Sequence, residues 1–145
     1  MKEQSYANHV RYYVPHHFIF YPLIGILTAI SAFNVFKYPE RATEWIAITL
    51  LFMLVCWVAY MMRQHYALTV QNRIVRLEMR LRYFELTHQR FEAVELKLSF
   101  GQIAALRFAP DEELLPLIER TVKEGLSPHM IKKSIRNWRP DHMRV

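Results

Sequence analysis

The sequence predicts an all-α integral membrane protein, and three observations support this fold class. Two apolar runs, at 18–36 and 45–62, hold 19 and 18 residues without a charged side chain. Each run is long enough to cross a hydrocarbon core of roughly 30 Å at about 1.5 Å per helical residue. Beyond the second run no glycine or proline occurs until Gly101, so its helix is expected to continue past the membrane.

Four consecutive segments are therefore expected. They are an interfacial or cytoplasmic N-terminal segment at 1–17, a transmembrane helical hairpin at 18–62, a cytoplasmic helix extension at 63–97, and a small C-terminal helical segment at 98–145.

The first apolar run fits a membrane span better than a signal peptide. It contains eleven Leu, Ile, Phe or Val residues, which together favour insertion by at most about 3 to 7 kcal/mol. The run is longer than a usual signal-peptide core, and no small-x-small cleavage site follows it. Three small residues, Gly25, Ala29 and Ala32, are expected to let a neighbouring helix approach closely, with the second run as the expected neighbour.

Loop length and basic residues predict the topology. Only eight residues, 37–44, join the two runs, so an antiparallel hairpin with both termini on one side is expected. Of the 19 Lys and Arg residues, two precede the first run, two lie in the loop and fifteen follow the second. The positive-inside rule then places both termini in the cytoplasm, with Arg63 at the lipid headgroups. Cys56, the single cysteine, lies in the second run and excludes an internal disulfide.

A heptad pattern follows the second run. Its positions, every three or four residues, are Ala67, Val70, Ile74, Leu77, Leu81, Phe84, His88 and Phe91. All are apolar except His88, which interrupts the seam, and Arg73, Arg76, Arg80 and Arg82 lie off it. This spacing is typical of a coiled coil. Packing of the same stripe against the rest of the chain explains the pattern equally well, and both alternatives stay open.

The C-terminal segment is expected to form short helices. Ser99 and Gln102 have the spacing of a capping box. A second helix is expected from Pro110 to Gly125, with Leu114, Leu115, Ile118 and Val122 on its apolar face. A third starts at Ser127 and Pro128 and is expected to run through Ile131, Ile135 and Trp138. About 45 residues are too few for a robust core, so this segment should pack on the long helix or on a partner.

Motifs near both ends suggest a family. They are Asn8-His9-x-Arg11-Tyr12 with Pro15 before the first run, and LSFGQIAALRFAPDEEL with LSPHMIKKSIRNWRPDHMRV near the C-terminus. The chain resembles, over nearly its whole length, a family of small bacterial membrane proteins classed as a domain of unknown function. The resemblance implies a bacterial inner membrane and two spans, and it implies no activity.

Histidines offer one candidate site for a cofactor. His16 and His17 precede the first span, and His65 follows the second on the same predicted side. Imidazoles from two helices could ligate haem or a transition metal. These positions equally suit the aromatic belt at the headgroup layer, where tyrosines also gather. We expect no cofactor and keep the three histidines as an alternative.

Other charged clusters indicate less. Glu85-x-x-His88, with Glu92 and Glu95, has the spacing of di-iron bundles, but such sites need a second Glu-x-x-His, which only a homodimer could supply. Basic residues around Trp138 match no nucleic-acid motif, so no nucleic-acid partner is expected. These tail residues are Lys132, Lys133, Arg136, Arg139 and Arg144.

The sequence therefore predicts a non-catalytic anchoring, scaffolding or accessory subunit. It contains no P-loop, nucleophile elbow, HExxH or dinucleotide fingerprint. The expected partners are the lipid bilayer and either further copies of the chain or other subunits of a membrane complex. Leu77, Leu81, Phe84 and Trp138 are the expected contact residues. A small haem or metal subunit and an anionic-lipid sensor are the alternatives.

Overall fold

A computed structural model describes residues 4–9 and 12–141, and these residues form helices and connections without a β-strand. Arg11 of the N-terminal motif and Arg144 of the basic tail lie outside the described residues. The chain divides into two compact units. We call Tyr12–Thr69 the hairpin unit, and residues 4–9 together with 70–141 the compact unit.

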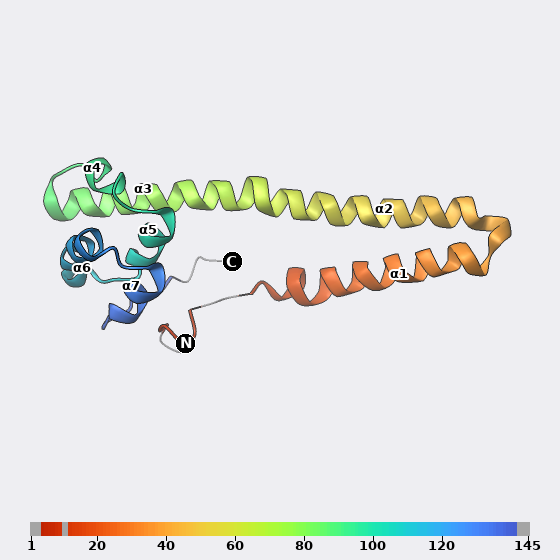
Figure 1. The fold of residues 1–145 in the computed structure, drawn as a ribbon, viewed down its shortest axis with the longest axis horizontal. Coiled ribbons are helices and arrows are strands. Elements are labelled where there is room, and N and C mark those ends of the chain that lie inside the picture. The colour runs from red at the N-terminus through yellow and green to blue at the C-terminus, as the bar shows by residue number, and fades with distance from the viewer. Residues whose placement is uncertain (1–3, 10–11, 142–145) are drawn as a thin grey trace. The chain divides into compact units, whose positions relative to one another are not determined.

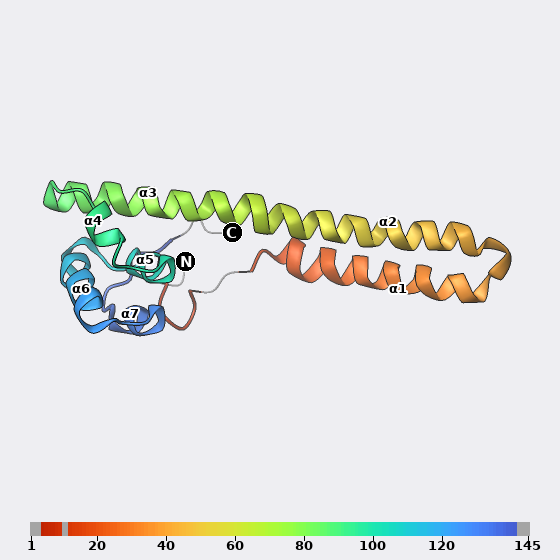
Figure 2. The same ribbon diagram turned by 45° about the horizontal axis from the view of Figure 1, so that its top comes forward.

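The hairpin unit is an antiparallel helix pair, as the short loop predicted. A π-helical turn, η1 (Pro15–Phe20), leads into α1 (Tyr21–Lys37), and the short η2 (Pro39–Arg41) connects it to α2 (Ala42–Met61). In both ribbon views α1 and α2 lie side by side and run in opposite directions (Figures 1 and 2).

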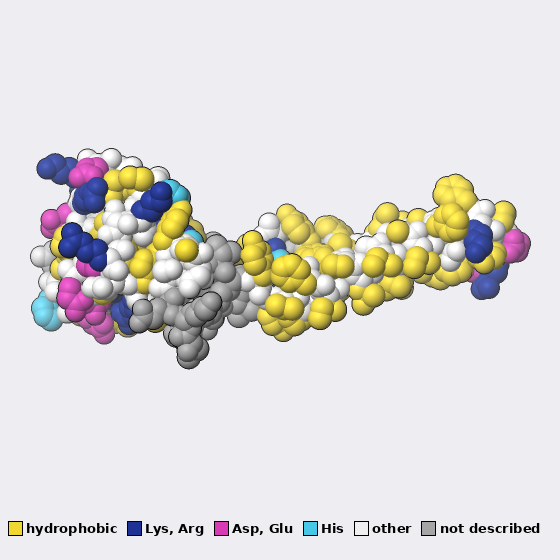
Figure 3. Space-filling view, turned by 90° about the horizontal axis from the view of Figure 1, so that it is seen from below, with side chains coloured by type: hydrophobic (Ala, Val, Ile, Leu, Met, Phe, Trp, Pro, Cys, Tyr) yellow, Lys and Arg dark blue, Asp and Glu magenta, His cyan; other side chains and the backbone are white. Residues whose placement is uncertain are grey.

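Two helical runs are long and apolar enough to cross a membrane. They cover Pro15–Lys37 and Pro39–Thr87, because a π-helical stretch, η3 (Met62–Ala67), joins α2 to α3 (Leu68–Thr87) without a break. Only 6% of the most apolar window of each run is buried. On the face of the hairpin seen in Figure 3, apolar side chains lie along most of the helix pair, and charged ones are seen at its turn and near its opposite end.

The helix pair is held by a different face of α1 from the one expected. Ile24 and Ser31 are buried, and the Thr49 hydroxyl of α2 donates a hydrogen bond of 2.9 Å to Ser31 Oγ. Gly25 and Ala29 remain exposed, and a Cβ added at Gly25 would meet nothing within 4 Å. The second helix is the neighbour of α1, as expected, and Ala32 is half-buried, but the prediction is wrong for Gly25 and Ala29. The hydroxyl pair, which needs a partner in apolar surroundings, lies on the neighbouring face.

The compact unit has one hydrophobic core, to which α3 contributes Val75 and Met79. Besides α3 it contains α4 (Glu92–Glu95), α5 (Phe100–Leu106), α6 (Asp111–Glu124) and α7 (Pro128–Ser134). Its buried core residues are Val75, Met79, Phe91, Leu98, Ile103, Ala105, Leu106, Phe108, Ala109, Leu114, Leu117, Ile118, Leu126, Ile131 and Ile135. The C-terminal helices thus pack on the long helix, one of the two options that their small size left open.

Local capping signals are confirmed in α5 and α6. Ser99 and Gln102 form the reciprocal capping box of α5, and α6 ends at Gly125 with a left-handed φ of 64°. The buried face of α6 differs from the expected one: Leu117 and Thr121 replace Leu115 and Val122 beside Leu114 and Ile118. Thr121 tolerates this burial because its hydroxyl donates to the Leu117 carbonyl at 2.6 Å.

The last helix is shorter than predicted. It ends at Ser134, and Ile135 is extended, so Trp138 does not belong to it. The Glu113 carboxylate accepts the backbone N–H groups of Arg136 and Asn137 at 3.0 and 3.1 Å. A carboxylate on another helix therefore satisfies donors that helical continuation would have used.

The long helix also ends earlier than the heptad pattern indicated. α3 stops at Thr87, and His88 has a left-handed φ of 56°. The Thr87 hydroxyl accepts the N–H of Gln89 at 3.1 Å, which turns the chain away from the helix. Phe91 then enters the core of the compact unit, so neither His88 nor Phe91 extends the heptad seam.

Candidate contact surface on the long helix

Helix α3 has two apolar faces, one buried in the core and one exposed. Val75 and Met79 are buried in the core, with Tyr83 packed against it. The opposite face is exposed and consists of Val70, Ile74, Leu77, Leu81 and Phe84, each between 49% and 61% accessible. We call these five residues the outer stripe. The stripe does not pack against the rest of the described chain, which removes that explanation for the heptad pattern.

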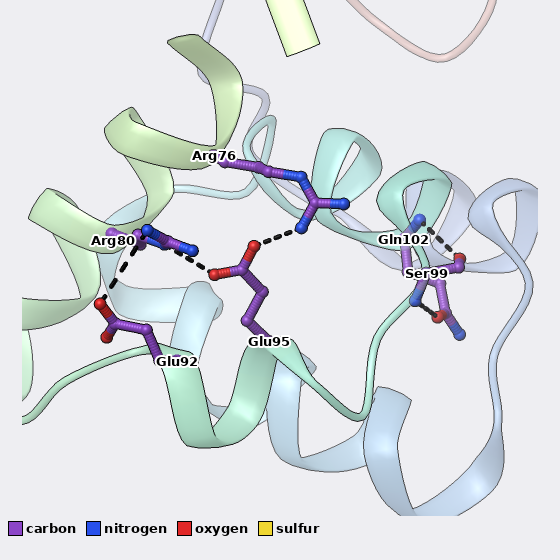
Figure 4. Close-up of polar contacts among 6 residues, drawn as sticks. All are labelled: Arg76, Arg80, Glu92, Glu95, Ser99 and Gln102. Carbon is purple, nitrogen blue, oxygen red and sulfur yellow. Dashed lines mark hydrogen bonds and ion pairs between the residues drawn. The ribbon is translucent and has the colours of Figure 1, made fainter. Parts of the chain in front are cut away.

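A buried ion cluster fixes the inner face of α3 to α4 (Figure 4). The Glu95 side chain is only 7% exposed and accepts hydrogen bonds from Arg76 and from Arg80 Nε, the latter at 2.7 Å. Arg80 also lies 4.0 Å from Glu92. Burial alone would raise the pKa of Glu95, but the hydrogen bonds and charges of the two arginines outweigh it and hold that pKa below its usual value.

Arg82 connects α3 to the turn before α6. Its Nε donates to the Asp111 carboxylate at 2.5 Å, and its Nη2 donates to the Ala109 carbonyl at 2.6 Å. These charge-assisted bonds leave the guanidinium almost buried. Together with the Glu95 cluster they set the rotation of α3, so the outer stripe has to face away from the core.

The four predicted contact residues do not lie together. Leu77, Leu81 and Phe84 share the outer stripe, whereas Trp138 packs against Phe108 with ring centroids 5.0 Å apart. His9, from the N-terminal segment, lies 5.6 Å from the Trp138 ring and 6.2 Å from the Phe108 ring, so the three rings form one cluster. Trp138 therefore contributes to the packing of the compact unit, and its role in binding a partner stays a prediction.

One protein family matches the chain over its full length. Residues 1–145 fit DUF6526, described as a family of unknown function. The chain belongs to DUF6526. This membership confirms the resemblance to an uncharacterised family that the terminal motifs indicated. No curated protein matches the chain, and no solved structure does either.

The histidines of this DUF6526 chain have mostly aromatic surroundings. The His16 ring stacks on Phe20 at 5.9 Å and meets the edge of His17 at 5.2 Å, while His65 is exposed in η3. Within residues 4–9 and 12–141 no group of three or more His, Cys, Asp or Glu side chains could hold a metal ion. Haem or metal binding by His16, His17 and His65 stays a prediction, and colour in the purified protein would be its first sign.

The Glu-x-x-His pattern does not assemble a site within one chain. His88 lies beyond the end of α3, and the Glu95 carboxylate is already bonded by Arg76 and Arg80. The structure thus gives Glu95 a structural role in place of the ligand role considered from its spacing.

Arg63 lies at a groove in the hairpin unit. The groove has a volume of about 780 Å³ and is lined mainly by apolar side chains of α1 and α2, among them Gly25, Ala29 and Trp57. Arg63 provides the one charged side chain of this lining. The small residues of α1 therefore border a groove. Membership of DUF6526 assigns no role to this groove.

Sequence reasoning missed the arginine cluster around Glu95. A signal was available: Glu95 stands at helical spacing from Phe91 and Leu98, which places a carboxylate on an apolar face. A buried carboxylate needs cations nearby, and the arginines off the heptad seam were candidates without an assigned role.

Proposed function

We propose that this DUF6526 protein spans a bacterial inner membrane twice and acts as a non-catalytic anchoring or scaffolding subunit. Its contact surface is the outer stripe of α3. The observation that supports this role is the exposure of five large apolar side chains on one face of a helix whose other face buries Val75 and Met79 in the core. Apolar patches of this kind mark interaction sites on proteins.

Low burial supports the membrane assignment of the hairpin unit. A core helix of a water-soluble protein would hide its apolar side chains, but only 6% of each apolar window is buried here. Exposed apolar area costs about 25 cal/mol per Å² in water and next to nothing in lipid. A signal sequence lies near the N-terminus, so it would account for the first apolar helix and not for the second.

The chain segments that form the compact unit support a topology with both ends of the chain on one side of the membrane. Residues 4–9 precede the hairpin and residues 70–141 follow it, yet they belong to the same unit. The Gln4 side chain accepts the N–H of Asp141 at 2.7 Å, and Lys132 Nζ lies 3.0 Å from His9 Nε2. Two crossings return the chain to its starting side, and the fifteen basic residues after the hairpin favour the cytoplasm.

The outer stripe has enough apolar surface to hold a partner. Full burial of one Leu, Ile or Phe side chain is worth about 1.5 to 3 kcal/mol, so covering five half-exposed side chains is worth roughly 4 to 8 kcal/mol. Confinement to a membrane raises the local concentration of a partner, which lowers the affinity required for association.

Native mass spectrometry of the protein taken gently from its own membrane would test this function. We expect the wild-type chain to carry additional mass, from further copies or from another polypeptide, and Leu81→Asp to lose it while still inserting. Leu96→Asp is the matched control, because Leu96 is 90% exposed and lies off the stripe. Equal masses for wild type and Leu81→Asp would refute the proposal.

Contact with anionic lipid is a second candidate function, supported by the groove that contains Arg63. An acyl chain suits the apolar lining, and a phosphate suits the guanidinium at roughly 1 kcal/mol. Bound phosphatidylglycerol should then remain on the wild-type protein in native mass spectra and decrease in Arg63→Gln. Retention of the same lipid by Arg63→Gln would argue against this candidate.

A further inference from the structure

We infer that the partner of the outer stripe is a second copy of this chain, with the two α3 helices paired parallel and in register. The inference rests on the proposed function, because it names the occupant of the same surface. Three independent features of α3 lead to it: the spacing of the stripe, the charges beside it, and the direction in which the helix leaves the hairpin.

The spacing of the stripe is that of a two-stranded coiled coil. From Val70 the steps are four, three, four and three residues, so Val70, Leu77 and Phe84 take d positions while Ile74 and Leu81 take a positions. A strict a/d stripe is the narrow seam by which two helices pair. Ile74 at a with Leu77 at d matches the preference of parallel dimers, whereas Leu81 at a and Phe84 at d do not, so the spacing carries this step.

The packing of the compact unit leaves this seam accessible. Val75 and Met79, which the core buries, occupy b and f positions, and Arg82 occupies another b position. In a two-stranded coiled coil a helix covers its a, d, e and g positions and leaves b, c and f outside. One helix can therefore hold its own core and a second copy at the same time.

Charges beside the seam select the parallel arrangement. The g positions are Arg73 and Arg80, and the e positions are Glu78 and Glu85. In a parallel, in-register pair each g residue faces the e residue five positions later in the other copy, so Arg73 meets Glu78 and Arg80 meets Glu85. An antiparallel pair would set g against g and e against e, which brings like charges together.

The Arg73 pair is the better one to test. Arg80 already donates to Glu95 within its own chain, whereas Arg73 and Glu78 are exposed and make no ion pair within the described residues. A change at Arg73 or Glu78 therefore leaves the ion cluster that holds α3 in place.

Chain direction points to the same register. Each α3 begins at Leu68, directly after the apolar α2 and the short η3. Two copies inserted with the same topology present their α3 helices in the same direction and start them at the same depth. Parallel, in-register pairing then needs no rearrangement, whereas a staggered pair would require one copy to shift along the membrane normal.

Cysteine cross-linking in native membranes tests orientation and register. In a Cys56→Ser background, Val70→Cys and Phe84→Cys should each form a covalent dimer on mild oxidation, because equivalent d positions meet. The yield should exceed that of Leu96→Cys, an exposed position off the seam, by roughly tenfold, since pairing raises the effective concentration of the thiols. Cross-links formed only when the Val70→Cys and Phe84→Cys proteins are mixed would show antiparallel pairing and overturn the inference.

Charge exchange provides the matched measurement. Arg73→Glu and Glu78→Arg should each lower the cross-linked fraction roughly tenfold, because each creates two like-charge contacts per dimer, and the double variant should restore it. Failure of the double variant to restore pairing would overturn the register that we infer.

The outcomes separate this inference from the proposed function. If Leu81→Asp releases a different polypeptide and neither cysteine cross-links, the stripe is a contact surface but its occupant is not a second copy. If Leu81→Asp releases nothing, both statements fail. Cross-linking at both single cysteines, with rescue by the charge exchange, supports both.

Discussion

The two units of this protein are stabilised by opposite means. In α1 and α2 only Ile24 and Ser31 are buried among the described residues, and large apolar side chains are exposed along both helices. The compact unit buries a continuous core and satisfies its buried carboxylate with two arginines. The hairpin thus leaves most of its apolar side chains uncovered within the chain, whereas the compact unit buries its own.

The comparison also separates two ways of satisfying polar groups. In the hairpin one hydroxyl pair, Thr49 with Ser31, connects the helices. In the compact unit charge-assisted bonds from Arg76, Arg80 and Arg82 reach carboxylates far away in the sequence. Changes to the compact unit should therefore cost more free energy of unfolding than similar changes in the hairpin.

The largest expected effect comes from removing a core side chain. Leu114 is completely buried, so Leu114→Ala should lower the free energy of unfolding of the compact unit by about 3 kcal/mol. With Trp45→Phe and Trp57→Phe, the fluorescence of Trp138 alone reports this unit during urea unfolding in detergent. Leu54→Ala, at a 51% exposed position of α2, is the control and should leave the urea midpoint unchanged. Equal losses of unfolding free energy from Leu114→Ala and Leu54→Ala would contradict the difference between the two units.

A smaller effect is expected from the buried ion cluster, and it depends on pH. Because the pKa of Glu95 is lowered on folding, its ionised form stabilises the compact unit above its usual value of 4.5, and this contribution is lost as the pH falls through the lower folded pKa. Glu95→Gln should cost about 2 kcal/mol at pH 7. The difference in free energy of unfolding between wild type and Glu95→Gln, measured with urea, should disappear as the pH is lowered.

Glu92→Gln is the control for that measurement. Its carboxylate is half exposed and lies 4.0 Å from Arg80. Glu92→Gln should therefore lower the free energy of unfolding by less than about 0.5 kcal/mol at any pH. A Glu95→Gln variant with the same stability difference at pH 3 and pH 7 would contradict the assignment of the lowered pKa.

The smallest expected effect lies in the hairpin. Thr49→Val removes the hydrogen bond to Ser31 and should weaken the association of α1 and α2 by about 0.6 kcal/mol. Titration with dodecyl sulfate, followed by far-UV circular dichroism, would measure it. Thr28→Val is matched, because the Thr28 hydroxyl donates only within its own helix, to Ile24. A loss above about 2 kcal/mol would show that the hydroxyl pair contributes far more than such bonds usually do.

The sequence predicted those features that short-range patterns encode. The antiparallel hairpin, the capping box of Ser99 and Gln102, and the end of α6 at Gly125 all follow from nearby residues. Which face of α6 is buried was predicted less well. Thr121 has a polar side chain, and its burial depends on the hydrogen bond from its hydroxyl to a carbonyl of the same helix.

Contacts between distant residues could not be predicted. Glu113 ends the last helix by binding N–H groups 23 and 24 positions later, and no local pattern indicates such a partner. The outer stripe was found as a heptad, but its extent was wrong because Thr87 and His88 end the helix before Phe91. Which face of α3 stays exposed depended on the arginines, whose partners lie 15 to 29 positions away.

The bond between Gln4 and Asp141 has a consequence for biosynthesis. These residues are 137 positions apart, so a ribosome that adds roughly 5 to 20 residues per second makes the first roughly 7 to 27 seconds before the second. The N-terminal segment must therefore wait, unprotected from proteases, while the rest of the chain is made. Its packing on Phe108 and Trp138 is then among the last steps of maturation, and translation that stops early leaves it without a place to dock.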